Sequence, residues 1–180
     1  MLMDQGMDTG AIVAQRRTAI LPGETAGELT SRLFRQGAEL LAKVLPGWLA
    51  GTVAAVSQNE AEATTTRLIA KEDGEMDWAF PALALERRLR AFTPWPGCYT
   101  RWEGKLLKIL AGAAVGIERL PGNAPGQVVA LPIGSIPPVG VVAGQGLLGL
   151  AKVQLEGRNA QGIEEFLRGY PRFLGTRLPS

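Results

Sequence analysis

The sequence predicts an α+β chain, in which a helical front part is followed by a small β-barrel. Two observations predict this fold. Between residues 25 and 51, apolar side chains recur at spacings of three and four residues, which is the period of an amphipathic helix. Between residues 98 and 155, short β-compatible runs are regularly separated by Gly and Pro, a pattern typical of small barrels.

The composition excludes several kinds of chemistry. With 180 residues, 46% of them hydrophobic and 20% charged, the chain has the composition of a globular protein. It contains one cysteine, Cys98, and no histidine. It can therefore form no intramolecular disulfide, no multi-cysteine or histidine-ligated metal site and no histidine-based catalytic triad, and we expect no bound metal.

The charges are unevenly distributed along the chain. Residues 1–72 carry seven Lys and Arg against eight Asp and Glu, a net charge of −1, whereas residues 73–180 carry twelve against nine, a net charge of +3. A basic bias supports binding to phosphates only where the fold collects the charges on one face, and otherwise serves solubility. The first ten residues have no basic segment and no long apolar run, so we expect a cytoplasmic protein without membrane contact.

The first twenty residues are expected to belong to a larger sheet. Residues 1–3 are expected to end a strand, residues 4–10 to form a turn, and residues 11–20 to contain short β-compatible runs. Such a segment cannot form a stable sheet by itself. We therefore expect Met1 to lie within a longer protein.

Helical signals follow from Thr25 onward. Thr25 and Glu28 have the spacing of a capping box. Apolar residues then recur up to Leu49, with Gly37 among them, which predicts two helices or one broken helix ending at Gly51. We expect the apolar side of this region to be a core face. Residues 52–72 are rich in Ser, Thr, Gln, Asn and Glu, which predicts a linker.

Residues 73–180 are predicted to form a second domain. A helix is expected over residues 81–91, before Pro94, and a final helix over 162–168 precedes an irregular basic tail. A Glu103-Gly104 hairpin turn joins the first two strands. The predicted strands are residues 98–102, 105–111, 114–117, 126–131, 140–143 and 147–155.

The aromatic residues of this second part have two expected roles. Trp78, Phe92 and Trp95 are flanked by prolines and apolar residues, so we expect them to pack in the core. Tyr99 and Trp102 lie on the first predicted strand and are more open positions, where nucleic-acid bases would stack.

Three segments resemble methionyl-tRNA formyltransferases. The pair LIAKEDGEMDW (68–78) and LERRLRAFTPWPGCYT (85–100) resembles the linker and the start of the family's C-terminal domain. The opening MDQGMDTG (3–10) is similar to the loop at the family's folate site. The segment VQLEGRNAQGIEEFLRGYPRFLGTRL (153–178) resembles the family's final strand and helix.

The resemblance implies a function and a division into domains. The family transfers a formyl group from 10-formyltetrahydrofolate to the amino group of methionine carried on initiator tRNA. Residues 1–51 would be the remnant, a strand, a loop and helices, of a doubly wound α/β formyltransferase catalytic domain. Residues 52–72 would be the linker, and residues 73–180 a tRNA-binding open barrel of the OB type. We expect the intact protein to be a monomer.

The same resemblance implies the catalytic residues. The family's active site uses an Asn, a His and an Asp, of which only the Asp is matched here, by Asp8. Asp8 would orient the histidine and favour its charged form, while Asn and His stabilise the developing oxyanion. Asp4, Gly6, Met7 and Asp8 would contact the folate. Because the chain has no histidine, we expect it to have no formyltransferase activity alone.

Contacts with tRNA would come mainly from Lys and Arg, since neutralised phosphates supply most of the affinity for nucleic acids. The candidates are Arg67, Lys71, Arg87, Arg88, Arg90, Lys105, Lys108, Lys152, Arg158 and Arg172.

Two other functions stay open. A stand-alone tRNA-binding or RNA-binding module would bind tRNA in a salt-sensitive manner through residues 73–180 alone. A fragment of a nucleotide-sugar formyltransferase is the other alternative, because AIVAQ (11–15) also occurs in that branch of the family. The segments KEDGEMDW (71–78) and RAFTPWPG (90–97) favour the enzyme that acts on tRNA.

Overall fold

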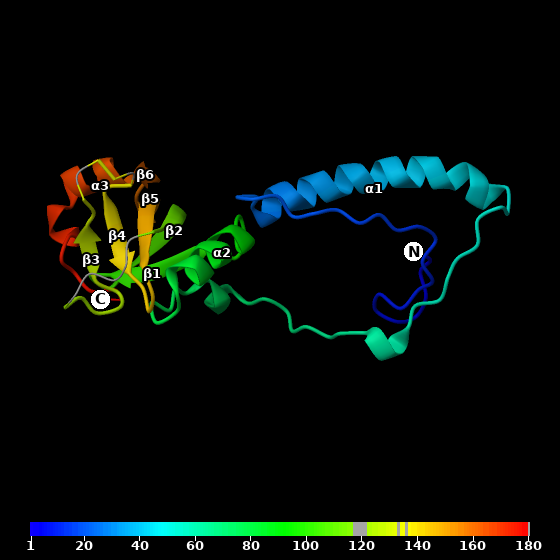
Figure 1. The fold of residues 1–180 in the computed structure, drawn as a ribbon, viewed down its shortest axis with the longest axis horizontal. Helices are drawn as coiled ribbons and strands as arrows, with labels where there is room; N and C mark the ends of the chain where they lie inside the picture. The colour runs from blue at the N-terminus through cyan, green and yellow to red at the C-terminus, as the bar shows by residue number, and fades with distance from the viewer. Residues whose placement is uncertain (117–121, 133, 136, 180) are drawn as a thin grey trace. The chain divides into compact units, whose positions relative to one another are not determined.

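The computed structural model describes residues 1–116, 122–132, 134–135 and 137–179. The chain divides into two compact units, Met1–Leu68 and Ile69–Ser180. Figure 1 shows one long helix in the first unit and a curled sheet with short helices in the second.

The first unit contains the helix α1 (Ala26–Leu49) and the short 3-10 helix η1 (Glu60–Glu62), joined by loops and extended chain. Residues 1–3 do not form the predicted strand. The β-compatible residues 11–20 form only one isolated antiparallel bridge, in which Ile12 and Val56 exchange backbone hydrogen bonds of 2.8 and 2.9 Å. The sheet that would accept these residues is not formed within this unit.

The start of α1 confirms the predicted capping box. The Thr25 hydroxyl accepts a hydrogen bond from the Glu28 amide (3.3 Å), and the Glu28 carboxylate accepts one from the Thr25 amide (2.9 Å). The carboxylate also accepts a hydrogen bond from the Thr25 hydroxyl (2.8 Å), and the bonds from the Thr25 amide and hydroxyl lower the pKa of Glu28.

The predicted break in this helix is wrong, because α1 runs without interruption through Gly37 and Pro46. A glycine inside a helix costs only about 1 kcal/mol relative to alanine, which the capped start and the flanking helix-forming residues offset. The helix ends before Gly51, which adopts a left-handed backbone with a φ of 70°.

The apolar side of α1 is not the core face that the sequence predicts. No residue of α1 is buried. Several of its large apolar side chains are exposed, because no other element of the first unit packs against them. Among the described residues, no helix is both long enough and apolar enough to cross a membrane.

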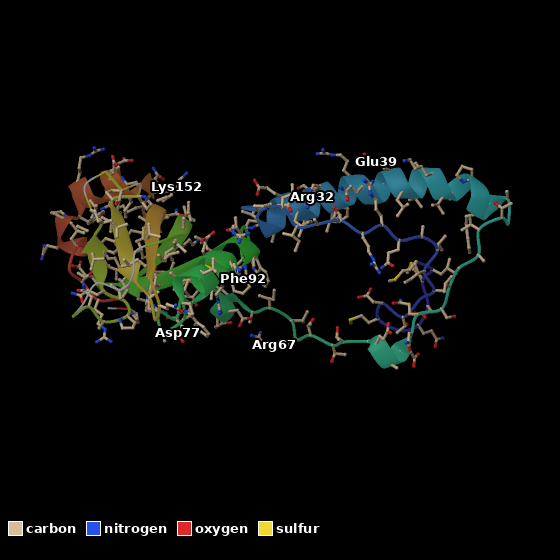
Figure 2. All side chains as sticks on the ribbon, viewed as in Figure 1. Arg32, Glu39, Arg67, Asp77, Phe92 and Lys152 are labelled. Carbon is tan, nitrogen blue, oxygen red and sulfur yellow. The ribbon has the colours of Figure 1, made fainter. Side chains whose placement is uncertain are left out.

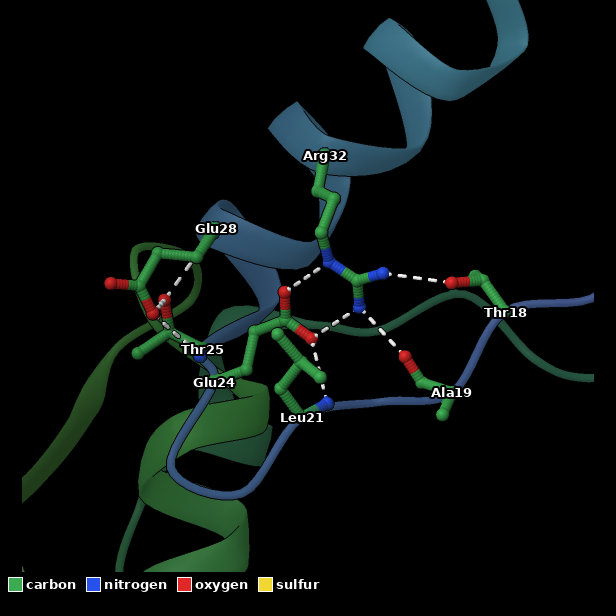
Figure 3. Close-up of polar contacts among 7 residues, drawn as sticks. All are labelled: Thr18, Ala19, Leu21, Glu24, Thr25, Glu28 and Arg32. Carbon is green, nitrogen blue, oxygen red and sulfur yellow. Dashed lines mark hydrogen bonds and ion pairs between the residues drawn. The ribbon is translucent and has the colours of Figure 1, made fainter. Parts of the chain in front are cut away.

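Arg32 holds the chain before α1 against the first turns of the helix (Figure 3). Its guanidinium donates two hydrogen bonds of 2.7 Å to the Glu24 carboxylate, and bonds of 2.8 Å to the Thr18 hydroxyl and the Ala19 carbonyl. The Leu21 amide also donates to Glu24 (3.0 Å). The bonds from Arg32 and then from Leu21 lower the pKa of Glu24 to about 2.

The Glu24 contact predicts a specific pH dependence. Because its pKa is lower in the folded chain than the ordinary 4.5, the contact stabilises the folded state fully above about pH 4.5. That contribution is lost as the pH falls toward 2. We expect the Glu24 carboxyl carbon to titrate in NMR spectra with a midpoint near 2, and to return toward 4.5 in an Arg32→Met variant. A midpoint near 4.5 in the unaltered chain would contradict the assignment.

The second unit is an antiparallel sheet with short helices around it. The strands follow the order β1-β2-β5-β4-β3, and β6 pairs with β5. The strands are β1 (Cys98–Trp102), β2 (Lys105–Val115), β3 (Val128–Ala130), β4 (Val139–Val142), β5 (Leu147–Leu155) and β6 (Gln161–Gly162). The helices are η2 (Lys71–Gly74), α2 (Ala82–Ala91), α3 (Ile163–Gly169) and η3 (Pro171–Phe173).

The local signals place most of these elements correctly. The bounds of β1 and β5 are those predicted, and α2 lies within the predicted helix. In contrast, β2 is a single strand that continues through Gly112, whereas two strands, 105–111 and 114–117, were predicted. Residue 117, the end of the second predicted strand, lies outside the described residues. A Cβ at Gly112 would lie 2.6 Å from the Gly149 carbonyl oxygen, so glycine permits the close approach of β5.

The core of this unit is closed by an aromatic cluster. The Trp102 ring makes edge contacts with the rings of Phe166, Tyr170 and Phe173, with centroids 5.8, 5.5 and 5.3 Å apart. Phe166 and Phe173 are fully buried. Burial of aromatic rings in this arrangement stabilises a core strongly.

The last residues belong to this core and are not the irregular tail that was expected. Phe173 and Leu178 are buried. The Val128 amide at the start of β3 donates a 2.8 Å hydrogen bond to the Thr176 carbonyl, and Gln127 pairs with Arg177 in an antiparallel bridge. The chain after α3 therefore adds an extended segment beside β3.

The sheet curls into a half-barrel that stays open between its two ends. At one end, Glu75 forms a parallel bridge with Tyr99 of β1. At the other end, Arg177 lies beside β3. A cavity of about 810 Å³ is lined by residues 75–79, Pro125 and residues 177–179. The segments that extend the sheet beyond its outer strands thus line a common groove.

Candidate functional site

The loop of residues 2–11 is closed by its own polar contacts. The Asp4 carboxylate accepts hydrogen bonds from the Gly6 amide (3.1 Å) and the Thr9 hydroxyl (2.6 Å). The Leu2 amide donates to the Ala11 carbonyl (2.8 Å). Gly10 is buried, and a Cβ there would overlap the Leu2 carbonyl. In this structure, Asp4 shapes the loop.

Asp8 projects from this loop in a left-handed backbone conformation, with a φ of 58°. Its side chain is exposed, as are those of its neighbours Met7 and Thr9. Within the fully described first unit, the Asp8 carboxylate has no hydrogen-bond or ion-pair partner. It is therefore available to accept a hydrogen bond from a group outside this unit.

Gln58 fixes the backbone on both sides of Thr9. Its side-chain amide donates hydrogen bonds of 2.7 Å to the Asp8 carbonyl and 2.8 Å to the Gly10 carbonyl. Sequence reasoning missed this role, because Gln58 lies in the predicted linker and nothing in its neighbourhood indicates a contact about fifty residues earlier. The bridge between Ile12 and Val56 brings the two segments together.

We expect a Gln58→Ala variant to loosen the Asp8 loop. It removes two side-chain hydrogen bonds, each worth about 0.5–1.5 kcal/mol. Amide hydrogen exchange at Leu2 and Val56 should therefore become about 5 to 30 times faster, whereas a Gln36→Ala control on α1 should leave it unchanged. Equal exchange in both variants would show that Gln58 does not hold the loop.

The second unit carries a basic face on the outer side of β1, β2 and β5. We define it as Tyr99, Arg101, Lys108, Lys152 and Gln154. Tyr99 lies opposite Lys108, and Lys108 lies opposite Gln154, in the strand register. Arg101 and Lys152 lie two residues from Tyr99 and Gln154, so alternation along the strands places them on the same side.

The cations of the basic face form no ion pair with a carboxylate of the described residues. Arg101, Lys108 and Lys152 are all exposed (Figure 2 labels Lys152). A cavity of about 230 Å³ opens beside Lys108 and Gln154. An extended surface of this charge suits a phosphate backbone.

Tyr99 adds an aromatic side chain to this face. It is partly buried, and burial and then the carboxylates of Glu75 and Glu72 raise the pKa of its hydroxyl, an effect that Arg101 opposes. Trp102 was expected at an open position, but it is only 3% exposed. Like the buried Thr100 two residues earlier, it lies on the inner side of β1.

Of the ten basic candidates, the structure brings Lys108 and Lys152 together on the basic face. Arg101 belongs with them and was missed, although its place opposite Leu106, two residues from Tyr99 on β1, follows once the hairpin register is known. Lys105 lies opposite Trp102, so it falls on the other side of β2. The remaining exposed candidates lie on other elements: Lys71 in η2, Arg87 on α2, Arg158 after β5 and Arg172 in η3.

Three further candidates are engaged in local contacts. Arg88 donates to the Asp73 carbonyl, and its guanidinium carbon lies 5.1 Å from the centre of the Phe92 ring. Arg90 lies 3.7 Å from the Glu86 carboxylate. Arg67 donates to the Leu68 carbonyl (3.0 Å). These contacts hold the start of the second unit and the chain before it (Arg67 and Phe92 are labelled in Figure 2).

The expected core aromatics are mostly confirmed. Trp78 is buried, and Phe92 is partly buried against the core. The prediction that Trp95 packs in the core is wrong, because this residue is 60% exposed. It lies between Pro94 and Pro96 in the turn after α2, which directs the chain over the surface.

Within the described ranges, no three His, Cys, Asp or Glu side chains lie close enough together to hold a metal ion. Cys98 is buried, and burial raises the pKa of its thiol to about 11. A thiol with this pKa is almost entirely protonated at neutral pH and unreactive.

The chain matches two known families in the order of its two units. Residues 1–45 match the family described as formyl transferase, and residues 68–171 match the formyl transferase C-terminal domain. The chain belongs to the formyl transferase family.

Curated relatives support the same assignment. The chain is 40% identical over 169 residues to the methionyl-tRNA formyltransferase of Chloroflexus aurantiacus. This alignment covers 94% of this chain and 53% of the relative. It is 41% identical over 178 residues to that of Myxococcus xanthus, covering 98% of this chain and 54% of the relative. The chain thus spans about half the length of these relatives.

The fold also resembles a solved structure. A variant of HypX from Aquifex aeolicus aligns with a TM-score of 0.69, at 16% sequence identity, over 95% of this chain and 30% of that protein. At this identity, the similarity shows the fold alone.

Proposed function

We propose that this chain is part of a methionyl-tRNA formyltransferase, which transfers the formyl group of 10-formyltetrahydrofolate to the amino group of methionine on initiator tRNA. The observation that carries the proposal is the identity of about 40% to enzymes of that name over nearly the whole chain, including both the Asp8 loop and the basic unit. The similarity to enzymes named methionyl-tRNA formyltransferase favours this function over transfer to a nucleotide sugar.

The proposed role of the first unit is to present Asp8. The exposed carboxylate would accept a hydrogen bond from a histidine supplied by another part of the enzyme, orient that ring and favour its charged form. The histidine and an asparagine would then stabilise the oxyanion that develops as the amine attacks the formyl carbon. Asp4, Gly6, Met7 and Asp8 would line the folate site, in a loop whose shape the hydrogen bonds of Asp4 and Gln58 maintain.

The proposed role of the second unit is to hold the tRNA as an open barrel of the OB type, within a domain that covers residues 73–180. The basic face would contact phosphates through Arg101, Lys108 and Lys152. Tyr99 would stack on an unpaired base or donate its hydroxyl proton to the backbone. The catalytic portion would then be residues 1–51, joined through a linker at 52–72, in a monomeric enzyme.

We expect the 180-residue chain alone to transfer no formyl group. It contains no histidine, so the Asp8 carboxylate has no imidazole to orient. The chain should form no formylmethionyl-tRNA above background when incubated with 10-formyltetrahydrofolate and methionyl initiator tRNA. The Myxococcus xanthus relative serves as the positive control. Turnover by the chain alone would refute the proposed division of the active site.

We expect the chain to bind initiator tRNA in a salt-dependent manner through the basic face. Lys108→Ala and Lys152→Ala should each weaken binding about three- to tenfold and reduce the slope of log Kd against log salt by about 1, because each removes one phosphate contact. Fluorescence anisotropy with labelled tRNA at several salt concentrations measures both quantities.

The matched control for this experiment is Arg168→Ala, which removes the same charge from the exposed side of α3. It should leave the affinity and the salt slope nearly unchanged. Equal losses in all three variants would mean that net charge, and not the basic face, determines binding.

A further inference from the structure

The two edges of the half-barrel in the second unit border one groove. We define the edge groove as the cavity of about 810 Å³ that is lined by residues 75–79, Pro125 and residues 177–179. One wall is the segment that bridges to β1 through Glu75, and the other is the segment beside β3 that contains Arg177. The volume lies within the range of about 300–1,000 Å³ that is typical of ligand sites. The groove is therefore large enough for a ligand and has main chain on both sides.

The wall at Glu75 has backbone groups that point away from β1. The Met76 amide donates a 2.8 Å hydrogen bond to the Tyr99 carbonyl. Because successive residues of an extended chain direct their N–H and C=O groups to alternate sides, the Glu75 carbonyl and the Asp77 amide point away from β1. Neither group makes a hydrogen bond with any of the described residues (Asp77 is labelled in Figure 2).

The wall at Arg177 is arranged in the same way. The Leu178 amide donates a 2.8 Å hydrogen bond to the Gly126 carbonyl, and the Thr176 carbonyl accepts one of 2.8 Å from the Val128 amide. The amide and the carbonyl of Arg177 itself therefore point away from β3, and they form no hydrogen bond within the described part of the chain. Unpaired edges of this kind are templates for a further strand. A strand in the groove would find such groups on both sides.

The buried part of the lining is apolar and contains an unpaired donor. Met76, Trp78 and Leu178 line the groove and are only 3%, 3% and 2% exposed. The indole N–H of Trp78 is buried and has no hydrogen-bond partner among the described residues. A buried donor without an acceptor is unfavourable, and a carbonyl oxygen of a ligand would satisfy it. These properties suit a ligand with both apolar groups and carbonyl oxygens, as a peptide has.

The rim of the groove at the first wall is acidic. Glu75 and Asp77 are exposed and lie two residues apart, on the same side of the extended chain. Neither carboxylate forms an ion pair with a Lys or Arg of the described residues, and Asp77 is held in place by the Ala79 amide, which donates to it (2.9 Å). Such a rim repels phosphates and attracts cations, which favours a basic peptide over a nucleic acid.

We propose that the edge groove binds an extended peptide of another protein, in which Lys or Arg alternates with apolar residues. The peptide adds a strand between the two edges and closes the half-barrel. Its backbone pairs with Asp77 and Arg177, its apolar side chains face Trp78, and its cations face Glu75 and Asp77. The proposal goes beyond the proposed function and needs neither formyl transfer nor contact with tRNA, so it can fail while that function holds.

The first experiment measures affinity. The full 180-residue chain is titrated into a fluorescein-labelled, seven-residue peptide in which lysine and valine alternate, and fluorescence anisotropy reports binding. We expect saturable binding that a Glu75→Lys variant weakens about tenfold, because repulsion replaces attraction at the rim. The matched control is Glu164→Lys, which makes the same charge change on the exposed side of α3 and should alter the affinity less than twofold.

The second experiment tests strand pairing. Amide hydrogen exchange at Asp77 and Arg177 should slow about tenfold when the peptide is bound, because both amides become donors, whereas exchange at Arg158, in the turn after β5, should not change. A peptide of the same sequence with N-methylated valines keeps its charge but loses backbone donors, and it should bind about tenfold more weakly. A Trp78→Phe variant, which keeps an apolar ring but removes the indole N–H, should bind about threefold more weakly.

Three results would overturn the proposal. One is the absence of binding by the unaltered chain. Another is equal weakening by Glu75→Lys and Glu164→Lys, because net charge and not the rim would then determine the affinity. The third is binding that leaves exchange at Asp77 and Arg177 unchanged, because the peptide would then lie outside the edge groove. The Glu75→Lys variant alters an exposed side chain, and an unchanged midpoint of thermal unfolding confirms that it folds.

Discussion

The alternation of side chains along β1, β2 and β5 determines both the stability and the surface of the second unit. Successive residues of a strand point to opposite sides of the sheet. The strand positions that bury Trp102, Ile109 and Val153 therefore direct Arg101, Lys108 and Lys152 outward. A shift of the register by one residue would expose the core and bury three cations, so the location of the basic face is fixed by the energetics of the core.

The first unit is organised by polar contacts in place of a core. The capping box, the Arg32 contacts and the two hydrogen bonds from Gln58 define its loops and the start of its helix. Such bonds have a small net stabilising effect where water competes for them. The apolar surface that would normally supply the larger stabilising term lies uncovered on α1. The two units thus differ in what keeps them ordered.

The features that the sequence predicts correctly depend on neighbouring residues. Thr25 and Glu28 are three residues apart, and Glu103-Gly104 adopts the positive φ angles of 49° and 72° that a tight hairpin requires. The bounds of β5 follow from an apolar run that continues into an alternation of polar and apolar residues. For the candidate site, the resemblance pointed to the Asp8 loop, and residue type alone proposed Lys108 and Lys152, which the fold then brings to one face.

The features that were missed depend on distant contacts. Gln58 binds a loop about fifty residues earlier, and Arg101 joins the basic face only through the pairing of β1 with β2. Phe173 enters the core because the chain after α3 returns to β3. Trp95 is the opposite case, since its apolar sequence neighbours are prolines that keep it in a surface turn. The local periodicity of the sequence does not indicate such contacts.

The return of the last residues to β3 has a consequence for folding during synthesis. The hairpin of β1 and β2 can form as soon as both strands have left the ribosome, because its contacts are local. The core remains open until Phe173 and Leu178 emerge about twenty residues after β5 has been made. During that interval, the nascent chain exposes the inner apolar side of a nearly complete sheet, which is the kind of surface that chaperones recognise.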